Sequence, residues 1–265
     1  MTVHLELRDL ARDIATEAGE LARRRRAEGV HIAASKSTLA DIVTEADREV
    51  EALIRDRLAK ERPGDGFLGE ESEPTAGESG ITWVVDPIDG TVNYASGMPS
   101  YAVSIAAVRG GDSFAAWEAL AGVVNAPALG ETFEAARGEG SRVHSASESA
   151  SLRVTSEFPA GALIGTGFGY DPATHEGDMR TVQAVMPLAR DVRRIGAAAV
   201  DLSYVAAGRL DAFFERGLNP WDLAAGALIV EEAGGSVIEL PADPFGRRMT
   251  IAGHADLVAR IADRV

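Results

Sequence analysis

The stretch Ile81-Thr82-Trp83-Val84-Val85-Asp86-Pro87-Ile88-Asp89-Gly90-Thr91 decides how this sequence is interpreted. Its first five residues are mostly β-branched or aromatic, which is typical of a buried strand. Pro87 lacks a backbone N–H and is expected to stop the strand, while Gly90 lets the backbone turn and approach a ligand closely. The sequence therefore predicts a strand that ends in two carboxylates, Asp86 and Asp89.

Two carboxylates this close repel each other unless a cation lies between them. Ligands that are all oxygens favour a hard cation, and Mg²⁺ takes a few carboxylates together with a substrate phosphate. Paired metal ions can activate a water and stabilise the leaving oxygen of a phosphoryl transfer, so no protein nucleophile is required. Because Asp, Pro and Gly also favour turns, the segment alone leaves an inert strand-ending turn open.

Further acids lie at the ends of other expected elements. Glu70 and Glu71 follow a short strand at Phe67–Leu68. Asp222 lies in the first turn of a helix that Pro220 opens, and proline is a standard residue at the first helical position. Together with Glu70 and Asp222, the carboxylates of Asp86 and Asp89 are expected to form a metal-binding site.

Composition limits the class of partner. The 265 residues carry a formal net charge of −15, and such a surface repels nucleic acid and anionic lipid. The run Arg23–Arg26 is compatible with a nucleic-acid patch, but it also complements the dipole at the end of an expected helix. The absence of cysteine excludes thiolate metal sites. We find no signal-peptide or membrane-spanning pattern, so a cytoplasmic protein without nucleic-acid or membrane partners is expected.

The hydrophobic pattern predicts a first half with antiparallel strands and a second, alternating α/β half. Helices are expected at Leu5–Glu28, Asp47–Lys60, His175–Leu188, Ala197–Ala207, Trp221–Ala233 and Ala255–Asp263. Strands are expected at Phe67–Leu68, Ile81–Val85, Tyr101–Val108, Phe114–Val124, Glu131–Ala136, Ala162–Thr166, Val192–Ile195, Leu210–Phe214, Ser236–Leu240 and Met249–Ala252. A loop is expected over His31–Asp41, and the small polar run Ser145–Ser151 is the candidate domain boundary.

Four segments together resemble the inositol monophosphatase family. Asp86–Tyr94 (DPIDGTVNY) resembles its first signature, and Trp221–Gly235 (WDLAAG, continuing through IVEEAGG) resembles its second. Gly69–Ser72 (GEES) resembles its third metal-site segment, and Asp41–Asp47 (DIVTEAD) resembles its N-terminal motif. The segments occur in family order and span most of the chain.

The resemblance implies a fold of stacked helix and sheet layers, an α-β-α-β-α sandwich like that of inositol monophosphatase and fructose-1,6-bisphosphatase. Residues 1–145 would form an α+β domain that carries most metal ligands, and residues 146–265 an α/β domain that carries Asp222. The active site would lie between these halves, and the protein would be a homodimer.

The resemblance also implies two or three Mg²⁺ ions per site. Glu70, Asp86 and the backbone carbonyl of Ile88 would hold one ion. Asp86, Asp89 and Asp222 would hold the second. A third, weaker ion would rest on Glu70 and waters. Inhibition by Li⁺ is expected on the same grounds.

Other family roles concern water and phosphate. Glu70 and Thr91 would position and activate the attacking water, with Asp47 hydrogen-bonded to Thr91. The amides of Gly90 and Thr91 would bind the phosphate. Lys36 matches a lysine on a loop that approaches the metals, although a solvated loop lysine is the alternative.

Substrate selection depends on a different region. Glu215 matches the family glutamate that hydrogen-bonds an inositol hydroxyl, and Gly196 and Ala197 match the segment on the sugar side. A carboxylate facing a polyol makes charge-assisted hydrogen bonds. Glu215 is otherwise a polar strand end, and Arg193, Arg194 and Arg216 are left open between substrate and subunit contacts.

The sequence therefore predicts Mg²⁺-dependent hydrolysis of a small phosphate monoester, with myo-inositol monophosphate as the leading substrate. Histidinol phosphate, fructose 1,6-bisphosphate and nucleotide 3′-phosphates are the rival substrates. A regulatory binding protein is the alternative outside enzymes, because some bacterial relatives are reported to act in RNA-linked regulation.

Overall fold

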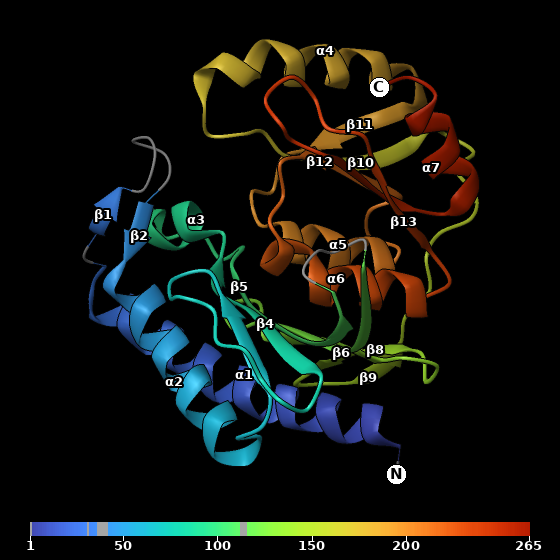
Figure 1. The fold of residues 1–265 in the computed structure, drawn as a ribbon. Helices are drawn as coiled ribbons and strands as arrows, with labels where there is room; N and C mark the ends of the chain where they lie inside the picture. The colour runs from blue at the N-terminus through green and yellow to red at the C-terminus, as the bar shows by residue number, and fades with distance from the viewer. Residues whose placement is uncertain (1, 31, 36–41, 112–115) are drawn as a thin grey trace.

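The computed structural model describes residues 2–30, 32–35, 42–111 and 116–265, which build five layers (Figure 1). Helices α1 (Val3–Glu28) and α2 (Glu45–Glu61) cover one face of a first sheet. Helices α5 (Ala198–Ala206) and α6 (Pro220–Glu232) lie between this sheet and a second one. Helices α4 (His175–Val185) and α7 (Ala255–Ala262) cover the far side. The expected α-β-α-β-α sandwich is confirmed.

The first sheet has seven strands in the order β3-β4-β5-β6-β7-β8-β9. They are β3 (Gly66–Gly69), β4 (Ile81–Asp89), β5 (Ala102–Gly110), β6 (Trp117–Ala126), β7 (Glu131–Ala136), β8 (Ser141–Ser145) and β9 (Ser149–Ser151). All neighbouring pairs are antiparallel except β3 and β4. A short helix, α3 (Thr91–Ser96), follows β4 directly, with Gly90 as its N-cap residue.

The second sheet has five strands in the order β11-β10-β12-β14-β13. They are β10 (Ala162–Thr166), β11 (Ala189–Arg193), β12 (Ala212–Arg216), β13 (Ser236–Leu240) and β14 (Met249–Gly253). Strand β10 is parallel to both β11 and β12, so the carboxyl ends of these strands meet at one edge, and β14 runs antiparallel to β12. Short 3₁₀ turns lie at Pro172–Thr174 and Met186–Leu188.

Helix α6 is buried on nearly all sides because it lies between the two sheets. Every residue from 223 to 230 is buried. Glycines make the close packing fit: a Cβ at Gly122 would lie 2.9 Å from the Ala225 backbone, and one at Gly226 would lie 2.7 Å from Leu202. Tight packing of this kind fixes the helix rigidly, and with it the position of Asp222 in its first turn.

Two expectations about single segments were wrong. Residues Ile32–Ser35, expected as loop, form strand β1, which pairs antiparallel with β2 (Ile42–Thr44). Pro87 was expected to stop β4, but the strand continues to Asp89, and its register with β5 shifts between Asp86 and Asp89. Such an irregularity leaves one position without a ladder partner, so the missing proline N–H is tolerated there.

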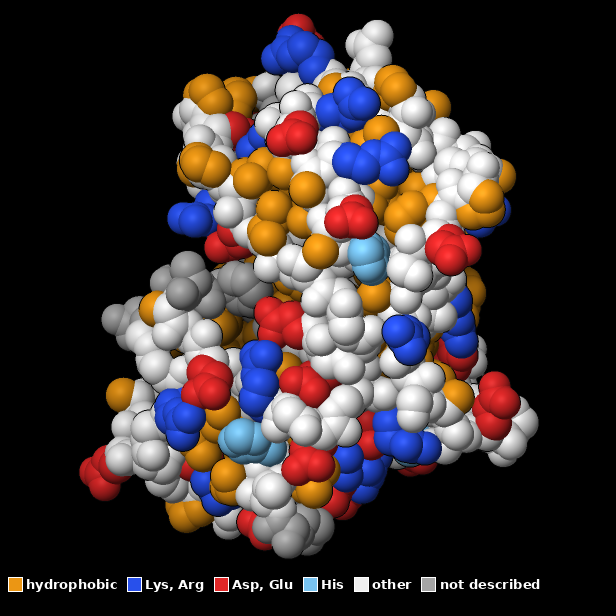
Figure 2. Space-filling view, turned by 90° about the vertical axis from the view of Figure 1, so that its right-hand side faces the viewer, with side chains coloured by type: hydrophobic (Ala, Val, Ile, Leu, Met, Phe, Trp, Pro, Cys, Tyr) orange, Lys and Arg blue, Asp and Glu red, His pale blue; other side chains and the backbone are white. Residues whose placement is uncertain are grey.

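The division into halves follows the two sheets. The first sheet runs to Ser151 and the second begins at Ala162, so the boundary after residue 145 stays a prediction. Figure 2 shows one face on which acidic and basic side chains are interspersed. The net negative charge is therefore not gathered into a single patch on that side. Among the described helices, none combines the length and apolar character required to cross a bilayer.

Candidate active site

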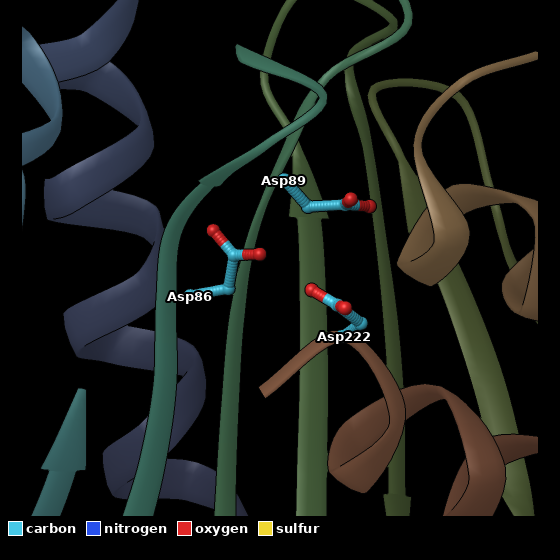
Figure 3. A group of neighbouring side chains, drawn as sticks. All are labelled: Asp86, Asp89 and Asp222. Atoms are coloured by element: carbon cyan, nitrogen blue, oxygen red, sulfur yellow. The ribbon is translucent and has the colours of Figure 1, made fainter. Parts of the chain in front are cut away.

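Three carboxylates converge between the two halves of the molecule (Figure 3). Asp86 and Asp89 come from the end of β4, and Asp222 comes from the first turn of α6. One oxygen from each of the three lies within 4.8 Å of the others. Residues 133 positions apart in the sequence are thus brought to one point. The described part of the chain places three of the expected metal ligands together.

Local hydrogen bonds fix the direction of each carboxylate. The Ile88 backbone N–H donates to Asp86 Oδ1 (3.0 Å) inside the irregular end of β4. The Asn219 N–H donates to Asp222 Oδ2 (2.7 Å), which is the reciprocal bond of a helix capping box. A capping carboxylate is thereby aimed out of the helix, toward the other two acids.

Asp89 is held from the opposite side of the cleft. Its two oxygens accept from the backbone N–H groups of Ala198 (3.1 Å) and Ala199 (2.8 Å) at the start of α5. The helix N-terminus also stabilises the negative charge. This contact joins the first signature segment to the segment that contains Gly196 and Ala197.

The electrostatics of the cluster favour a bound cation. Burial raises the pKa of Asp86 well above its usual value, and the neighbouring Glu70 and Asp89 charges raise it further. Burial raises the pKa of Asp89 to about 7, and burial together with the Asp89 charge raises that of Asp222. Two buried carboxylates and the half-buried Asp222, this close together, cannot all be ionised at neutral pH without a compensating positive charge. Their oxygens fit a hard divalent ion such as Mg²⁺.

Thr91 and Asp47 form a separate pair beside the cluster. The Thr91 hydroxyl lies 3.2 Å from Asp47 Oδ1 and 3.0 Å from the carbonyl oxygen of Ile88, and donates its one proton between them. Asp47 Oδ2 accepts from the Thr44 backbone N–H (2.7 Å) in the capping box of α2. Burial raises the pKa of Asp47 to about 6. The oxygen lone pairs of Thr91 are thereby left to accept a hydrogen bond from another group.

Glu70 lies at the mouth of the same site. Its backbone N–H donates to the carbonyl of Val85 (3.2 Å) where β3 ends beside β4. It lines the cleft together with Asp86 and Thr91. The charge of Glu70 raises the pKa of the Asp86 carboxyl, so the two acids share one electrostatic environment.

The cleft has a volume of about 440 Å³ and reaches from the carboxylates to the second sheet. Gly90, Gly196, Ala197 and Glu215 line it, as the sequence predicts for a substrate pocket. Lys36 lies outside the described residues.

Gly90 has a left-handed backbone (φ +88°), and a Cβ there would lie 2.9 Å from the carbonyl oxygen of Ser100. Only glycine makes this turn into α3 without strain. The turn places the backbone of Gly90 and Thr91 on the cleft wall.

Glu215 faces the cleft from the end of β12. Its carboxylate lies so close to Gly167 that a Cβ at that position would be 1.9 Å from Oε2. Burial raises the pKa of Glu215 to about 8, against the opposing effect of the Arg194 charge. At neutral pH the group can therefore both donate and accept hydrogen bonds.

Several cleft residues were missed by the sequence reasoning. Phe168, Gly169 and Tyr170 line the cleft just after β10, and Arg247 lines it from the turn before β14. In open α/β sheets, ligands bind outside the carboxyl ends of parallel strands, so the end of β10 was a usable signal. For Arg247 we find no such local signal.

The Asn93 side chain connects two segments of the chain by hydrogen bonds. Its side-chain amide lies 2.8 Å from the carbonyl oxygen of Ser100 and 2.9 Å from that of Ile195, and donates to both. Because these two carbonyls belong to different halves of the molecule, one buried side chain sets their separation. It lies within the first signature segment but had no predicted role.

The layered fold and the carboxylate cluster in its central cleft define the class of metal-dependent phosphatases. The chain belongs to the inositol monophosphatase family, whose family model matches residues 4–261. It is therefore a phosphoric monoester hydrolase, of a family that uses a divalent metal.

The names of similar proteins agree with this family assignment. The chain is 46% identical over 247 residues to the inositol-1-monophosphatase SuhB of Mycobacterium tuberculosis. This alignment covers 88% of this chain and 83% of that protein. A solved structure of Mycobacterium tuberculosis SuhB has a TM-score of 0.82 at 42% identity, over 98% of this chain and 95% of that one. A relative from Xylella fastidiosa, 39% identical over 201 residues, is named Nus factor SuhB and is matched over 75% of this chain and 69% of its own.

Proposed function

We propose that this chain hydrolyses the phosphate monoester of a small polyol, with myo-inositol monophosphate as the leading substrate and Mg²⁺ as the cofactor. The observation that carries the proposal is the cluster of the buried Asp86 and Asp89 with the half-buried Asp222, whose oxygens lie within 4.8 Å of one another in the cleft that Thr91 also lines. The names of the mycobacterial relatives support inositol as the alcohol.

The residues of this site would hold two Mg²⁺ ions, and a third more weakly. Glu70, Asp86 and the Ile88 carbonyl form one donor set, and Asp86 with Asp89 and Asp222 forms the other. Glu70 with waters would hold the third ion. Bound Mg²⁺ supplies positive charge that neutralises the phosphate and the charge developing on the leaving oxygen.

Thr91 and Asp47 would orient the attacking water together with Glu70. Because the Thr91 hydroxyl donates toward Asp47 and the Ile88 carbonyl, its lone pairs can accept a hydrogen bond from the water, and a proton can pass from the water to Thr91 as the Thr91 proton passes to Asp47. Asp47, whose pKa burial raises to about 6, is suited to take up that proton near neutral pH. The water oxygen then bonds to phosphorus and the bond between phosphorus and the alcohol oxygen breaks. The leaving oxygen takes a proton from solvent water, and Asp47 later returns its proton to solvent, so no net proton stays on the protein.

The remaining cleft residues would bind phosphate and alcohol. The backbone amides of Gly90 and Thr91 lie at the start of α3, and unpaired N–H groups at a helix start suit an anion. Glu215, with Gly196 and Ala197, would contact the hydroxyl groups of the polyol. A site built to hydrogen-bond a hydroxyl discriminates strongly against analogues that lack it.

Further properties follow from the family assignment as proposals. We expect a cytoplasmic homodimer that Li⁺ inhibits. A regulatory role is the second candidate, because one relative is named a Nus factor. The complete carboxylate cluster favours catalysis over a purely regulatory role.

A substrate panel tests the proposed function. Phosphate release would be measured for inositol 1-phosphate, histidinol phosphate, fructose 1,6-bisphosphate and a nucleotide 3′-phosphate, each with Mg²⁺ and with a chelator. We expect inositol 1-phosphate to have the highest kcat/KM, and only with Mg²⁺. Fast turnover of histidinol phosphate beside slow turnover of inositol 1-phosphate would reject the leading substrate.

A further inference from the structure

The alcohol side of the cleft is walled by two irregular segments. Residues 168–171 follow β10, and residues 217–219 connect β12 to α6, and both line the cleft. Tyr170, 45% exposed, projects from the first segment, and Glu215 immediately precedes the second. Irregular segments lack a continuous ladder of backbone hydrogen bonds, and apart from single bonds such as Gly217 N–H to the Arg248 carbonyl (2.9 Å) their position depends on side chains.

Arg247 is the side chain that touches both segments. Its Nη1 lies 2.7 Å from the position that a Cβ on Gly169 would take. Its Cδ lies 3.0 Å from the corresponding position at Gly217, a glycine with φ +82°. Larger side chains at either glycine would therefore displace Arg247, and the arginine fills the space between the two walls.

The guanidinium group is held by two carboxylates. Nη1 and Nη2 donate to the two oxygens of Asp178 (3.0 and 2.8 Å), in the bidentate geometry typical of strong arginine pairs. Nε and Nη2 donate to Asp243 Oδ2 (3.1 and 2.9 Å). The side chains of Arg247 and Asp178 are only 14% and 6% exposed.

The same carboxylates also accept hydrogen bonds from backbone N–H groups. Asp178 Oδ2, on α4, accepts from the N–H of Gly169 (3.2 Å). Asp243 Oδ1 accepts from the N–H groups of Phe245 (2.9 Å) and Arg247 itself (3.0 Å). The cluster of Arg247, Asp178 and Asp243 thus links α4, the segment after β10 and the turn before β14.

Arg247 has one side-chain N–H left, which is too few for the bidentate contact by which arginine anchors a phosphate. A guanidinium has five N–H donors, and four of them already point to carboxylate oxygens. Its position in the cleft wall therefore indicates a structural effect on neighbouring substrate contacts, rather than a direct contact with phosphate.

We infer that the cluster of Arg247, Asp178 and Asp243 positions the alcohol side of the cleft and thereby sets the affinity for the leaving alcohol. This inference rests on the proposed function. Arg247 is a positioning residue: it acts through the segments that carry Tyr170 and adjoin Glu215. Within the described residues, the side-chain hydrogen bonds of Arg247 go to Asp178 and Asp243 and not to the carboxylate cluster or the turn at Gly90, so these should be unaffected by its loss.

The test compares Arg247→Met with its neighbour Arg248→Met. Methionine keeps most of the aliphatic stem but removes all hydrogen bonds. Arg248 is the matched control because its side chain is 54% exposed, its ion pair within the described residues is with Glu239 at 3.2 Å, and it does not line the cleft. Asp178→Asn, which keeps the side-chain volume, is the second variant if Arg247→Met does not fold. Thermal unfolding checks each protein.

The KM for substrate and the inhibition constant of inorganic phosphate distinguish a positioning role from a general loss of structure. We expect KM for inositol 1-phosphate to rise about tenfold in Arg247→Met with kcat within about twofold, as for lost ground-state binding. The inhibition constant of inorganic phosphate should stay within about twofold, because phosphate uses the other side of the cleft. Arg248→Met should match the wild type. An equal rise in KM and in the phosphate constant, or no rise in KM, would overturn the inference.

Hydrogen exchange gives a readout that does not depend on activity. Amides in residues 168–171 and 217–219 should exchange faster in Arg247→Met, while those in residues 86–94 should not. Unchanged exchange in the two wall segments would also overturn the inference. A wild-type chain that releases no phosphate from any monoester would instead reject the proposed function, and the exchange experiment would still decide the role of Arg247.

Discussion

Removing the divalent metal should make the stability of this protein fall as the pH rises. Burial raises the pKa of Asp89 to about 7 and that of Asp47 to about 6, and raises those of Asp86 and Asp222 as well. Between about pH 5 and pH 8 the metal-free folded state therefore binds more protons than the unfolded chain. Stability decreases with pH wherever the folded state binds more protons, and the loss is complete above the folded pKa.

Asp89 alone sets the scale of the effect. Its pKa moves from an ordinary 3.8 to about 7. About two pK units of this difference are lost between pH 5 and pH 8, which corresponds to roughly 2.5 kcal/mol of unfolding free energy. For a chain of this size the melting temperature should fall by roughly 5 °C or more.

The assay is thermal unfolding in a chelator over this pH range. High salt would screen repulsion among the surface charges but not within the buried cluster. The same series with excess Mg²⁺ should be nearly flat, because a bound cation compensates the ionised carboxylates. A metal-free melting temperature that stays constant or rises over this range would refute the reasoning.

Three substitutions extend these expectations. Thr91→Val keeps the shape but removes the hydroxyl beside Asp47, so kcat should fall roughly 10²-fold or more with little change in KM, and steady-state kinetics would check this. Glu215→Gln should raise KM for inositol 1-phosphate about tenfold and remove any change in KM near pH 8, so a variant KM that still titrates there would contradict the role of Glu215. Gly90→Ala should destabilise the fold by roughly 1–3 kcal/mol in denaturant unfolding, because φ is +88° and Ser100 blocks a Cβ; a cost below a few tenths would count against a strained turn.

Local sequence signals predicted where Asp86, Asp89 and Asp222 lie at the ends of their elements. The β-branched run before Asp86 marks β4, and the proline before Trp221 marks the start of α6, so the carboxylates at both ends follow from position alone. The antiparallel strand Glu131–Ala136 was predicted with its observed bounds. Signals of this kind are contained within a few residues.

Features that depend on distant partners were not predictable. Residues 32–35 become a strand only because β2 pairs with them. Arg247 reaches Asp178 across 69 positions, and no periodicity marks such a pair. The prediction that Pro87 ends β4 was wrong, because the register shift that accommodates a residue without an N–H arises from the pairing of β4 with β5. Tyr170 and Arg247, which line the cleft beside the predicted Glu215, are of this second kind, so the sequence gives least information on which alcohol the proposed substrate carries.

The most direct test of the central claim is the rate of phosphate release from inositol 1-phosphate as Mg²⁺ is added back to chelated protein. For the wild type, we predict no release without Mg²⁺ and a rate that saturates as the ion is restored. For Glu70→Gln and Asp222→Asn, we predict rates reduced roughly 10²-fold or more at saturating Mg²⁺. Full activity in the chelator, or wild-type rates in both variants, would contradict the assignment of the carboxylate cluster as the catalytic metal site.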